Sequence, residues 1–250
     1  LFFWRDLKNG NLTILLCCLI VSIGSISATQ FLTNRIEFSL SKEIRTTLAA
    51  DRRIVSDKKI PPSWISKAEK MNFKVVTGSQ FPSMAFSKNE SVLVSIKSVT
   101  KNYPLRGQLI VSKKNRSKEV FNVSDLKKGE ALVDPTLLSI LKITLGKKFF
   151  LGDKEFVVKG IIESEPDRGI SFVNFSPRIL INDSDLSDTG LIQPGSRVSY
   201  RLWVASDSSD KLKDFDSFIS KEIGPGQRID TFESARPELN QALSKVRSFL

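Results

Sequence analysis

Two carboxylates close together in a short loop are the first residues whose types and spacing could do chemistry. The loop runs from Glu163 to Gly169 with the sequence Glu-Ser-Glu-Pro-Asp-Arg-Gly, and Glu165 and Asp167 lie in its middle. A pair of carboxylates can supply the acid and the base or nucleophile of glycoside hydrolysis. The other interpretation is a turn, in which Pro166 and Gly169 set the backbone and Asp167 pairs with its neighbour Arg168. The turn is the interpretation we favour.

Histidine and cysteine limit the chemistry further. The chain has no histidine, and its two cysteines, Cys17 and Cys18, are neighbours inside an apolar segment. Neighbouring residues on a helix point in different directions, so this pair is not expected to form a disulfide. A structural zinc site normally needs four ligands. We interpret both cysteines as membrane-facing, which excludes a cysteine nucleophile, a Ser-His-Asp triad and a histidine-ligated metal from the rest of the chain.

Phosphate-binding motifs are incomplete. Gly146-Lys147-Lys148 lacks both the earlier glycine and the Ser or Thr of a nucleotide-binding P-loop. The sequence also contains no dinucleotide fingerprint and no Gly-x-Ser-x-Gly elbow. We therefore expect no catalytic residue, no bound cofactor and no metal site.

The chain is basic, with 38 lysines and arginines, 27 aspartates and glutamates and a net charge of +11. Such a balance suits nucleic acid, anionic lipid headgroups or an acidic partner. The densest basic run, residues 113–118, lies between two apolar runs and is predicted to be a solvated hairpin loop. No nucleic-acid motif accompanies it, so no nucleic-acid partner is expected.

A long uncharged segment lies near the start of the chain. No charged residue occurs between Lys8 and Arg35, and the apolar part runs from Leu12 to Phe31. A helix needs roughly 20 mostly apolar residues to cross a bilayer. This stretch is therefore predicted to be a transmembrane helix, with the lipid bilayer as its surroundings.

A cleaved signal peptide is the alternative for this segment. Residues 25–27, Ser-Ile-Ser, have the small side chains that a signal peptidase accepts. The apolar run is longer than a typical signal-peptide core, however, and a helical pattern continues past it, which favours a retained anchor. Because Arg5 and Lys8 precede the span, the positive-inside rule predicts a cytoplasmic segment 1–11 and an extracytoplasmic main domain.

Beyond the span, apolar residues recur at every fourth position, as on one face of a helix. This stripe consists of Leu32, Ile36, Leu40, Ile44 and Leu48. Residues 32–50 are therefore predicted to be a membrane-proximal stalk helix. Its expected partner is a return helix over residues 234–250, whose apolar face is formed by Leu239, Leu243, Val246 and Leu250. The alternative is that the stripe packs on the core of its own domain.

Between these helices, residues 51–233 are predicted to form one extracytoplasmic core domain. Strands are expected at 53–56, 73–76, 91–99, 109–111, 120–123, 131–134, 147–151, 155–162, 179–182 and 198–204. Helices are expected at 63–71, 135–146 and 207–223, and residues 81–84 are expected to interrupt the strands as a turn. The second of these helices is predicted to have Asp134 as its cap and Pro135 as its first residue. Irregular alternation of strands with short helices and hairpins indicates an α+β domain.

Several motifs, taken in order, resemble those of a known family. They include Phe81-Pro82-Ser83-Met84, Tyr103-Pro104-Leu105-Arg106-Gly107, Val133-Asp134-Pro135, Leu151-Gly152-Asp153, Glu165-Pro166-Asp167-Arg168-Gly169, Thr189-Gly190-Leu191-Ile192-Gln193-Pro194-Gly195-Ser196-Arg197-Val198 and Ala235-Arg236-Pro237. Together they resemble the FtsX/MacB-like ABC transporter permeases, most closely the YbbP type. The match covers nearly all of the chain.

The resemblance implies a fold and a set of partners. It implies a protein of the bacterial inner membrane with a MacB-like periplasmic core domain. It also implies a dimeric permease assembly whose further spans follow residue 250. A separate cytoplasmic ABC ATPase subunit would supply the motion, and a periplasmic lysophospholipase/thioesterase-type enzyme is an associated partner. The motif residues are expected to form turns and to have no catalytic role: Pro82, Arg106, Gly107, Asp167, Arg168, Gly169, Pro194, Gly195 and Arg197.

Two functions therefore remain open. The first is a non-catalytic permease subunit that relays ATPase-driven motion to a periplasmic domain handling a hydrophobic or lipid-like substrate. The second is a membrane-tethered periplasmic binding or hydrolytic module without a transport role. A rigid helix leaving the membrane favours the first function, because a flexible linker does not transmit motion.

Overall fold

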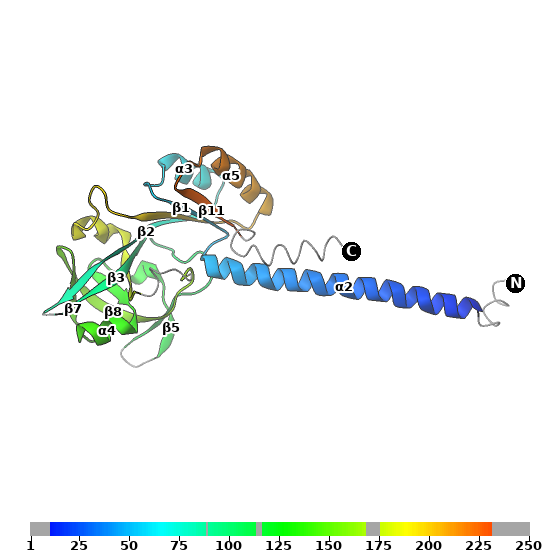
Figure 1. The fold of residues 1–250 in the computed structure, drawn as a ribbon, viewed down its shortest axis with the longest axis horizontal. Coiled ribbons are helices and arrows are strands. Elements are labelled where there is room, and N and C mark those ends of the chain that lie inside the picture. Colours follow the sequence, from blue (N-terminus) through cyan, green and yellow to red (C-terminus); the bar gives the residue numbers. More distant parts are fainter. Residues whose placement is uncertain (1–10, 89, 114–116, 169–175, 232–250) are drawn as a thin grey trace. The chain divides into compact units, whose positions relative to one another are not determined.

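A computed structural model describes residues 11–88, 90–113, 117–168 and 176–231 of the chain (Figure 1). Inside the first helix, the side chains of residues 11–13, 36–38 and 40–45 lie outside this description. The chain divides into two compact units between Glu43 and Ile44. We call the described residues from Ile44 to Thr231 the folded domain.

Helix α2 is a single uninterrupted helix, Asn11–Leu48. Its stretch Ile14–Arg35, 22 residues long, is the one described helix that is long and apolar enough to cross a membrane, and it is not buried within the structure. Large apolar side chains such as Val21 and Phe31 are exposed along it. Such a surface suits hydrocarbon as its solvent rather than water.

One half of the folded domain has a ferredoxin-like arrangement. It consists of β1 (Arg52–Ser56), α3 (Pro62–Lys70), β2 (Lys74–Ser87), β10 (Ser199–Ala205), α5 (Ser209–Glu222) and β11 (Gln227–Asp230). Its antiparallel strands lie in the order β11-β1-β10-β2, which is the split β-α-β topology. Figure 1 shows α3 and α5 together beside these strands. Buried Trp64, Phe73 and Phe215 form the core between the helices and the sheet.

The other half is inserted between β2 and β10. It comprises β3 (Glu90–Val99), β4 (Ile110–Ser112), β5 (Lys118–Val120), β6 (Glu130–Val133), α4 (Pro135–Leu141), β7 (Lys148–Leu151), β8 (Lys154–Ser164), β9 (Arg178–Asn182) and the 3-10 helices η1 (Val123–Asp125) and η3 (Asp183–Thr189). Strands β2, β3, β9, β6, β8 and β7 pair in turn and close into a ring. Each of them contributes buried apolar side chains to one shared core. The predicted α+β class is confirmed.

Helix α4 shows why local sequence specifies some elements well. The Asp134 side chain accepts a hydrogen bond from Thr136 N at 2.9 Å, and Pro135 occupies the first turn, as predicted. The helix ends at Leu141 rather than near Gly146, because Lys142 adopts a left-handed conformation (φ 53°). Leu137 and Leu141 are buried in the core of the ring.

The predicted turn around Pro82 is wrong, because this residue lies inside β2, which continues to Ser87. Pro82 pairs with Ser95, whose backbone N–H bonds to the Pro177 carbonyl on the β9 side of β3. The Pro82 nitrogen must therefore face away from β3. On that side β2 is unpaired at Pro82, since its pairing with β10 ends at Gln80 and its pairing with β7 begins at Ala85. The missing N–H of proline costs no ladder bond on such an edge.

Candidate functional site

The C-terminal end of α2 is bonded into the folded domain. Two loops from the inserted half supply donors to carbonyls that a helix end leaves unsatisfied. The Asp167 backbone N–H bonds to Thr47 O at 2.8 Å, and the Arg106 N–H bonds to Ala49 O at 2.9 Å. Ala49 has a positive φ of 62° and is buried, as is Leu48. The helix thus ends in the domain core rather than in a linker.

A buried carboxylate follows directly after this helix end. Asp51 accepts a hydrogen bond from the Arg106 guanidinium at 2.9 Å and another from the Ser206 backbone N–H at 3.0 Å. Its side chain has no exposed surface, whereas Arg106 also reaches the exposed carboxylate of Asp207 at 3.0 Å. The hydrogen bonds that Arg106 donates to Asp51 and Asp207 raise the pKa of its guanidinium. The charge pair fixes the loop that caps α2.

Beside the helix end lies a group of titratable side chains with little contact with water, which we call the ion cluster. Its members come from four strands and two loops: Arg53, Lys97, Tyr103, Glu165, Asp167, Arg178 and Arg201. The Lys97 ammonium is 2.7 Å from Glu165 Oε1 and 3.2 Å from Asp167 Oδ2. It also donates to the Tyr103 hydroxyl at 2.6 Å. The cluster therefore joins both halves of the domain around Lys97.

Asp167 connects the cluster to α2. Its carboxylate pairs with Arg201 at 2.9 Å and with Arg53, while its backbone N–H holds Thr47. Arg53 and Arg201 belong to the ferredoxin-like half, whereas Asp167 follows β8 of the inserted half. One residue thus contacts the helix end and both halves of the domain.

Burial controls the protonation of the cluster. It lowers the pKa of Lys97 from 10.5 to about 7, although Glu165 beside it acts in the opposite direction. Burial also raises the pKa of Tyr103 well above 10.0. For Glu165, burial raises the pKa, but the charges of Lys97 and Arg178 outweigh it and the net shift is downward. The carboxylate is therefore ionised at neutral pH.

The acidic loop is a turn, but its predicted local pair is wrong. Arg168 donates to Asp134 at 2.6 Å, and Asp167 pairs with the cluster cations instead. Asp167 itself takes the positive φ, 68°. The side chains of Glu165 and Asp167 have no exposed surface. They are placed for structural support and not for attack on a glycosidic bond.

The remaining predicted motif residues are distributed over the folded domain. Gly107 has a φ of 81° and passes close to Pro166 and the Thr46 carbonyl, so it belongs to the capping loop of α2. Pro194, Gly195 and Arg197 lie in an exposed loop before β10, and Gly195 has a φ of 90°. Of these four residues, the structure places only Gly107 at the end of α2. Gly169 lies outside the described residues.

The stalk prediction is only partly covered by the structure. Leu12 lies in α2, Phe31 and Leu32 are exposed on it, and Leu48 is buried at its end. The side chains of Ile36, Leu40 and Ile44, and all of Leu239, Leu243 and Val246, lie outside the described residues. Packing between the stalk and the return helix stays a prediction.

Lys97, Arg178 and Arg201 were not predicted as site residues. A signal was present at Lys97, because this charged residue occupies the same face of its strand as the buried Ser95 and Val99. A charge in the middle of an otherwise buried strand usually has a partner. The sequence alone does not show which one.

Comparison with known proteins supplies a context for this geometry. No family model matches the chain. The chain is 26% identical over 249 residues to the uncharacterized ABC transporter permease YbbP of Escherichia coli (strain K12). The alignment covers all of this chain but 30% of that permease, so the chain spans less than a third of its relative.

One solved structure has a similar fold, and a second aligns less well. The periplasmic region of MacB from Actinobacillus actinomycetemcomitans aligns with 80% of this chain and 95% of its own length, at a TM-score of 0.50 and 12% identity. The extracellular domain of the noncanonic ABC-type transporter YknZ from Gram-positive bacteria aligns with 72% of this chain and 100% of its own, at a TM-score of 0.47 and 12% identity. The fold assignment depends on the MacB region. The resemblance to the FtsX/MacB-like ABC permeases is thereby confirmed, with a fold like that of the MacB periplasmic region and one apolar helix ahead of it.

Proposed function

We propose that this chain is the N-terminal part of a membrane-spanning permease subunit of a bacterial ABC transporter. In this proposal α2 crosses the inner membrane, residues 1–11 are cytoplasmic and the folded domain is periplasmic. Similarity to a permease over the whole chain and the apolar surface of Ile14–Arg35 support it. Arg5 and Lys8 ahead of the span support the orientation.

The proposed role of the chain is to relay motion. A separate cytoplasmic ATPase would move the membrane helices, and α2 would carry that movement to the periplasmic domain. The observation that carries this proposal is the end of α2, which is a continuous helix to Leu48 and is held by Asp167 N and Arg106 N. A helix fixed in the domain core moves that core when it moves.

Partners and substrate follow from the same proposal. The permease would act as a dimer, would not itself be an enzyme and would handle a hydrophobic or lipid-like substrate. A periplasmic lysophospholipase/thioesterase-type enzyme would act beside it. The alternative, a tethered binding or hydrolytic module, would need a flexible tether or accessible catalytic groups. The continuous helix and the buried carboxylates of Glu165 and Asp167 weigh against it.

A flexible insertion in α2 tests the relay. In the complete permease reconstituted with its ATPase, a short Gly-Ser segment is inserted between Ile36 and Glu37, just after the apolar stretch Ile14–Arg35. The same segment inserted between Pro194 and Gly195, in an exposed loop, is the matched control. Hydrogen exchange of the folded domain is measured with and without ATP.

We expect ATP to change exchange in the unmodified protein and in the loop control. In the α2 insertion this response should be lost, while the ATPase still binds and the folded domain keeps its exchange pattern without ATP. An undiminished ATP response in the α2 insertion would show that the helix transmits nothing.

A further inference from the structure

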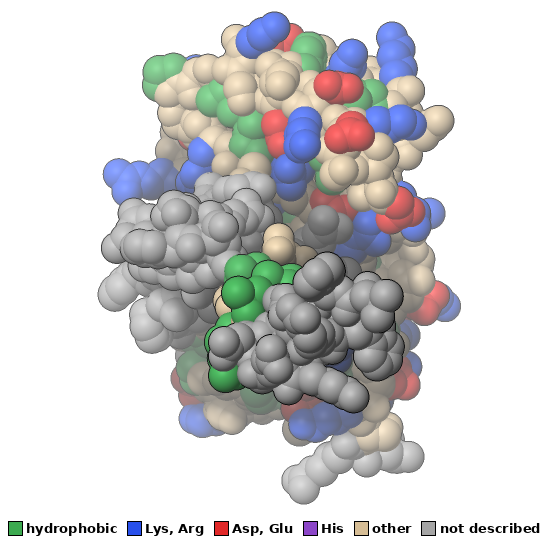
Figure 2. All heavy atoms as spheres, turned by 90° about the vertical axis from the view of Figure 1, so that its right-hand side faces the viewer, with side chains coloured by type: hydrophobic (Ala, Val, Ile, Leu, Met, Phe, Trp, Pro, Cys, Tyr) green, Lys and Arg blue, Asp and Glu red, His purple; other side chains and the backbone are tan. Residues whose placement is uncertain are grey.

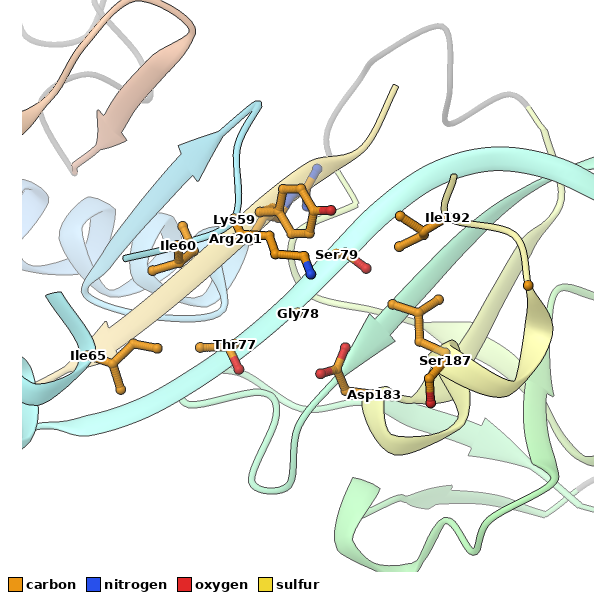
Figure 3. A pocket seen from close by; sticks show the side chains of 13 residues that line it. Lys59, Ile60, Ile65, Thr77, Gly78, Ser79, Asp183, Ser187, Ile192 and Arg201 are labelled. Atoms are coloured by element: carbon orange, nitrogen blue, oxygen red, sulfur yellow. The ribbon is translucent and has the colours of Figure 1, made fainter. Parts of the chain in front are cut away.

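A cavity of about 470 Å³ opens in the folded domain, against the middle of β2. We call it the β2 cavity (Figure 3). Its walls come from both halves of the domain: the segment between β1 and α3, the strands β2 and β10, and η3 with the loop that follows it. Its volume lies within the range of roughly 300–1,000 Å³ that small-molecule sites have.

Much of the cavity wall is apolar. Ile60, Ile65, Leu186, Ile192 and Tyr200 line it, and all five are only partly buried. Large apolar side chains that stay half exposed in a concave surface gain free energy when a ligand covers them, about 25 cal/mol per Å² removed from water. The wall therefore suits a hydrocarbon chain.

The same cavity has a cationic side. Lys59, just after β1, and Arg201 of β10 both line it, and Figure 3 labels both. Lys59 is exposed and forms no ion pair with any residue that the structure describes. The one carboxylate in the lining, Asp183, comes from η3 and accepts a hydrogen bond from the Ser98 hydroxyl at 2.6 Å. An exposed cation beside an apolar wall favours an anionic group on the ligand.

We propose that the β2 cavity binds a single-chain amphiphile, with its anionic headgroup at Lys59 and its hydrocarbon chain along the apolar wall. The proposal rests on the function proposed above, and it specifies the class and the place of the hydrophobic substrate. A carboxylate or a phosphate headgroup would satisfy the Lys59 ammonium equally well, since both accept charge-assisted hydrogen bonds.

Photocrosslinking tests the site. The full chain is held in nanodiscs of phosphatidylcholine and exposed to photoreactive dodecyl phosphate, with unlabelled dodecyl phosphate as competitor. Dodecyl alcohol is the neutral probe with the same chain. The variants are Lys59→Gln, with the neighbouring exposed Lys58→Gln as the matched control because Lys58 does not line the cavity. Ile192→Asp places a charge in the apolar wall.

Crosslinks are expected on the β2 cavity, around Ile60 and Ile192. Lys59→Gln should weaken competition by dodecyl phosphate about tenfold, because one hydrogen bond between charged groups is lost. The same variant should leave competition by dodecyl alcohol unaffected. Lys58→Gln should change neither, and Ile192→Asp should abolish both. Crosslinks elsewhere in the folded domain, or equal competition in Lys59→Gln and Lys58→Gln, would overturn the proposal.

These outcomes are independent of the relay. The crosslinking needs neither the ATPase nor transport, so failure to bind at the cavity would leave the permease proposal standing. Failure of the insertion experiment would likewise leave a measured amphiphile site in place.

Discussion

At the scale of single residues, Lys97 has the most unusual surroundings in the folded domain. Its ammonium is fully buried between Glu165 and Asp167 and beside the Tyr103 hydroxyl. Removing a charge from water is costly unless partners replace the hydration. One of these partners, Asp167, also holds the end of α2 through its backbone N–H to Thr47 O. The protonation of Lys97 is therefore linked to the residue that caps the helix.

The first prediction concerns the pH dependence of stability. The pKa of Lys97 falls from 10.5 to about 7 on folding, so between these values the unfolded chain binds more protons than the native one. The free energy of unfolding must then rise as pH increases from 7 to 10.5. In Lys97→Met this contribution should be absent. Urea unfolding of the full chain, followed by fluorescence of the buried Trp64 and Trp203, measures it.

The decisive quantity is the difference in the free energy of unfolding between the natural chain and Lys97→Met. It should grow in favour of the natural chain between pH 7 and 10, and it should be constant below pH 7, where Lys97 is protonated in both states. Parallel pH profiles for the natural chain and Lys97→Met across this window would contradict the assignment.

The second prediction concerns Gly78, where β2 passes close to β3. A Cβ at this position would meet the Ser98 carbonyl oxygen inside van der Waals contact, and the Trp203 ring at 3.1 Å. We expect Gly78→Ala to lower the free energy of unfolding by about 3 kcal/mol. Gly224→Ala is the control, because its nearest neighbour, Gln227 Oε1, is 3.9 Å away. Equal unfolding midpoints for both variants would show that β2 and β3 can separate freely.

Residue roles were predictable only where the signal is local. The Asp134 cap follows from Asp-Pro at the start of an apolar helix and is confirmed. The ion-pair partner of Asp167 was mispredicted as its sequence neighbour Arg168. The actual partners, Arg53 and Arg201, are far away in the sequence and only the tertiary fold brings them close. Ion pairs that join distant segments depend on the tertiary fold.

At the scale of elements, the end of α2 is the feature on which the proposed function depends. Asp51 holds the capping loop through Arg106, and its side chain is inaccessible to water. Removal of a buried charge partner leaves the other group uncompensated. The loop and the helix end should therefore be sensitive to this carboxylate.

The third prediction uses the two carboxylates that Arg106 contacts. Asp51→Ala should lower the free energy of unfolding of the folded domain by about 2–4 kcal/mol. Asp207→Ala should have a much smaller effect on the free energy of unfolding, because Asp207 is almost fully exposed and water screens its pair with Arg106. Urea unfolding by tryptophan fluorescence compares them. A larger effect of Asp207→Ala than of Asp51→Ala would be inconsistent with this arrangement.

Most strands and helices were predictable from alternation and helical spacing. The hairpin of β7 and β8 and the helices α3 and α5 lie close to their predicted places. β11 was missed because Gln227–Asp230 has a single apolar residue, Ile229, and is defined by pairing with β1. β2 was predicted too short because Pro82 suggests an interruption, which the unpaired edge of the strand makes unnecessary.

At the scale of the whole molecule, one half of the folded domain is inserted into the chain of the other, ferredoxin-like half. Strands β3, β6, β7, β8 and β9 of the closed ring lie in the connection between β2 and β10, and β2 of the ferredoxin-like half completes the ring. The order of the strands in the ring could not be read from the sequence, since it depends on pairs such as β6 with β9 that are distant in the chain. The α+β class and the apolar helix that precedes the domain could be predicted from the sequence.

The net positive charge has no single location on the face shown in Figure 2. There, Lys and Arg side chains are interspersed with Asp and Glu side chains. Interspersed charges suit solubility more than they suit one large docking surface. On this face the basic balance therefore does not indicate a nucleic-acid partner.

In the proposed permease, α2 carries the chain out of the cytoplasm, through the membrane and into the core of a periplasmic domain. Labelling of single cysteines by a membrane-impermeant maleimide in intact cells tests it most directly. The variants are Lys8→Cys and Lys213→Cys, each in a chain whose Cys17 and Cys18 are replaced by serine. Lys213 is exposed on α5 of the folded domain.

We expect Lys213→Cys to be labelled in intact cells and Lys8→Cys to be labelled only after lysis, and both labelled chains should retain α2. Labelling of Lys213→Cys only after lysis would contradict the orientation. A labelled Lys213→Cys chain whose mass shows that it starts near Thr29 would instead contradict the retained helix, and with it the relay.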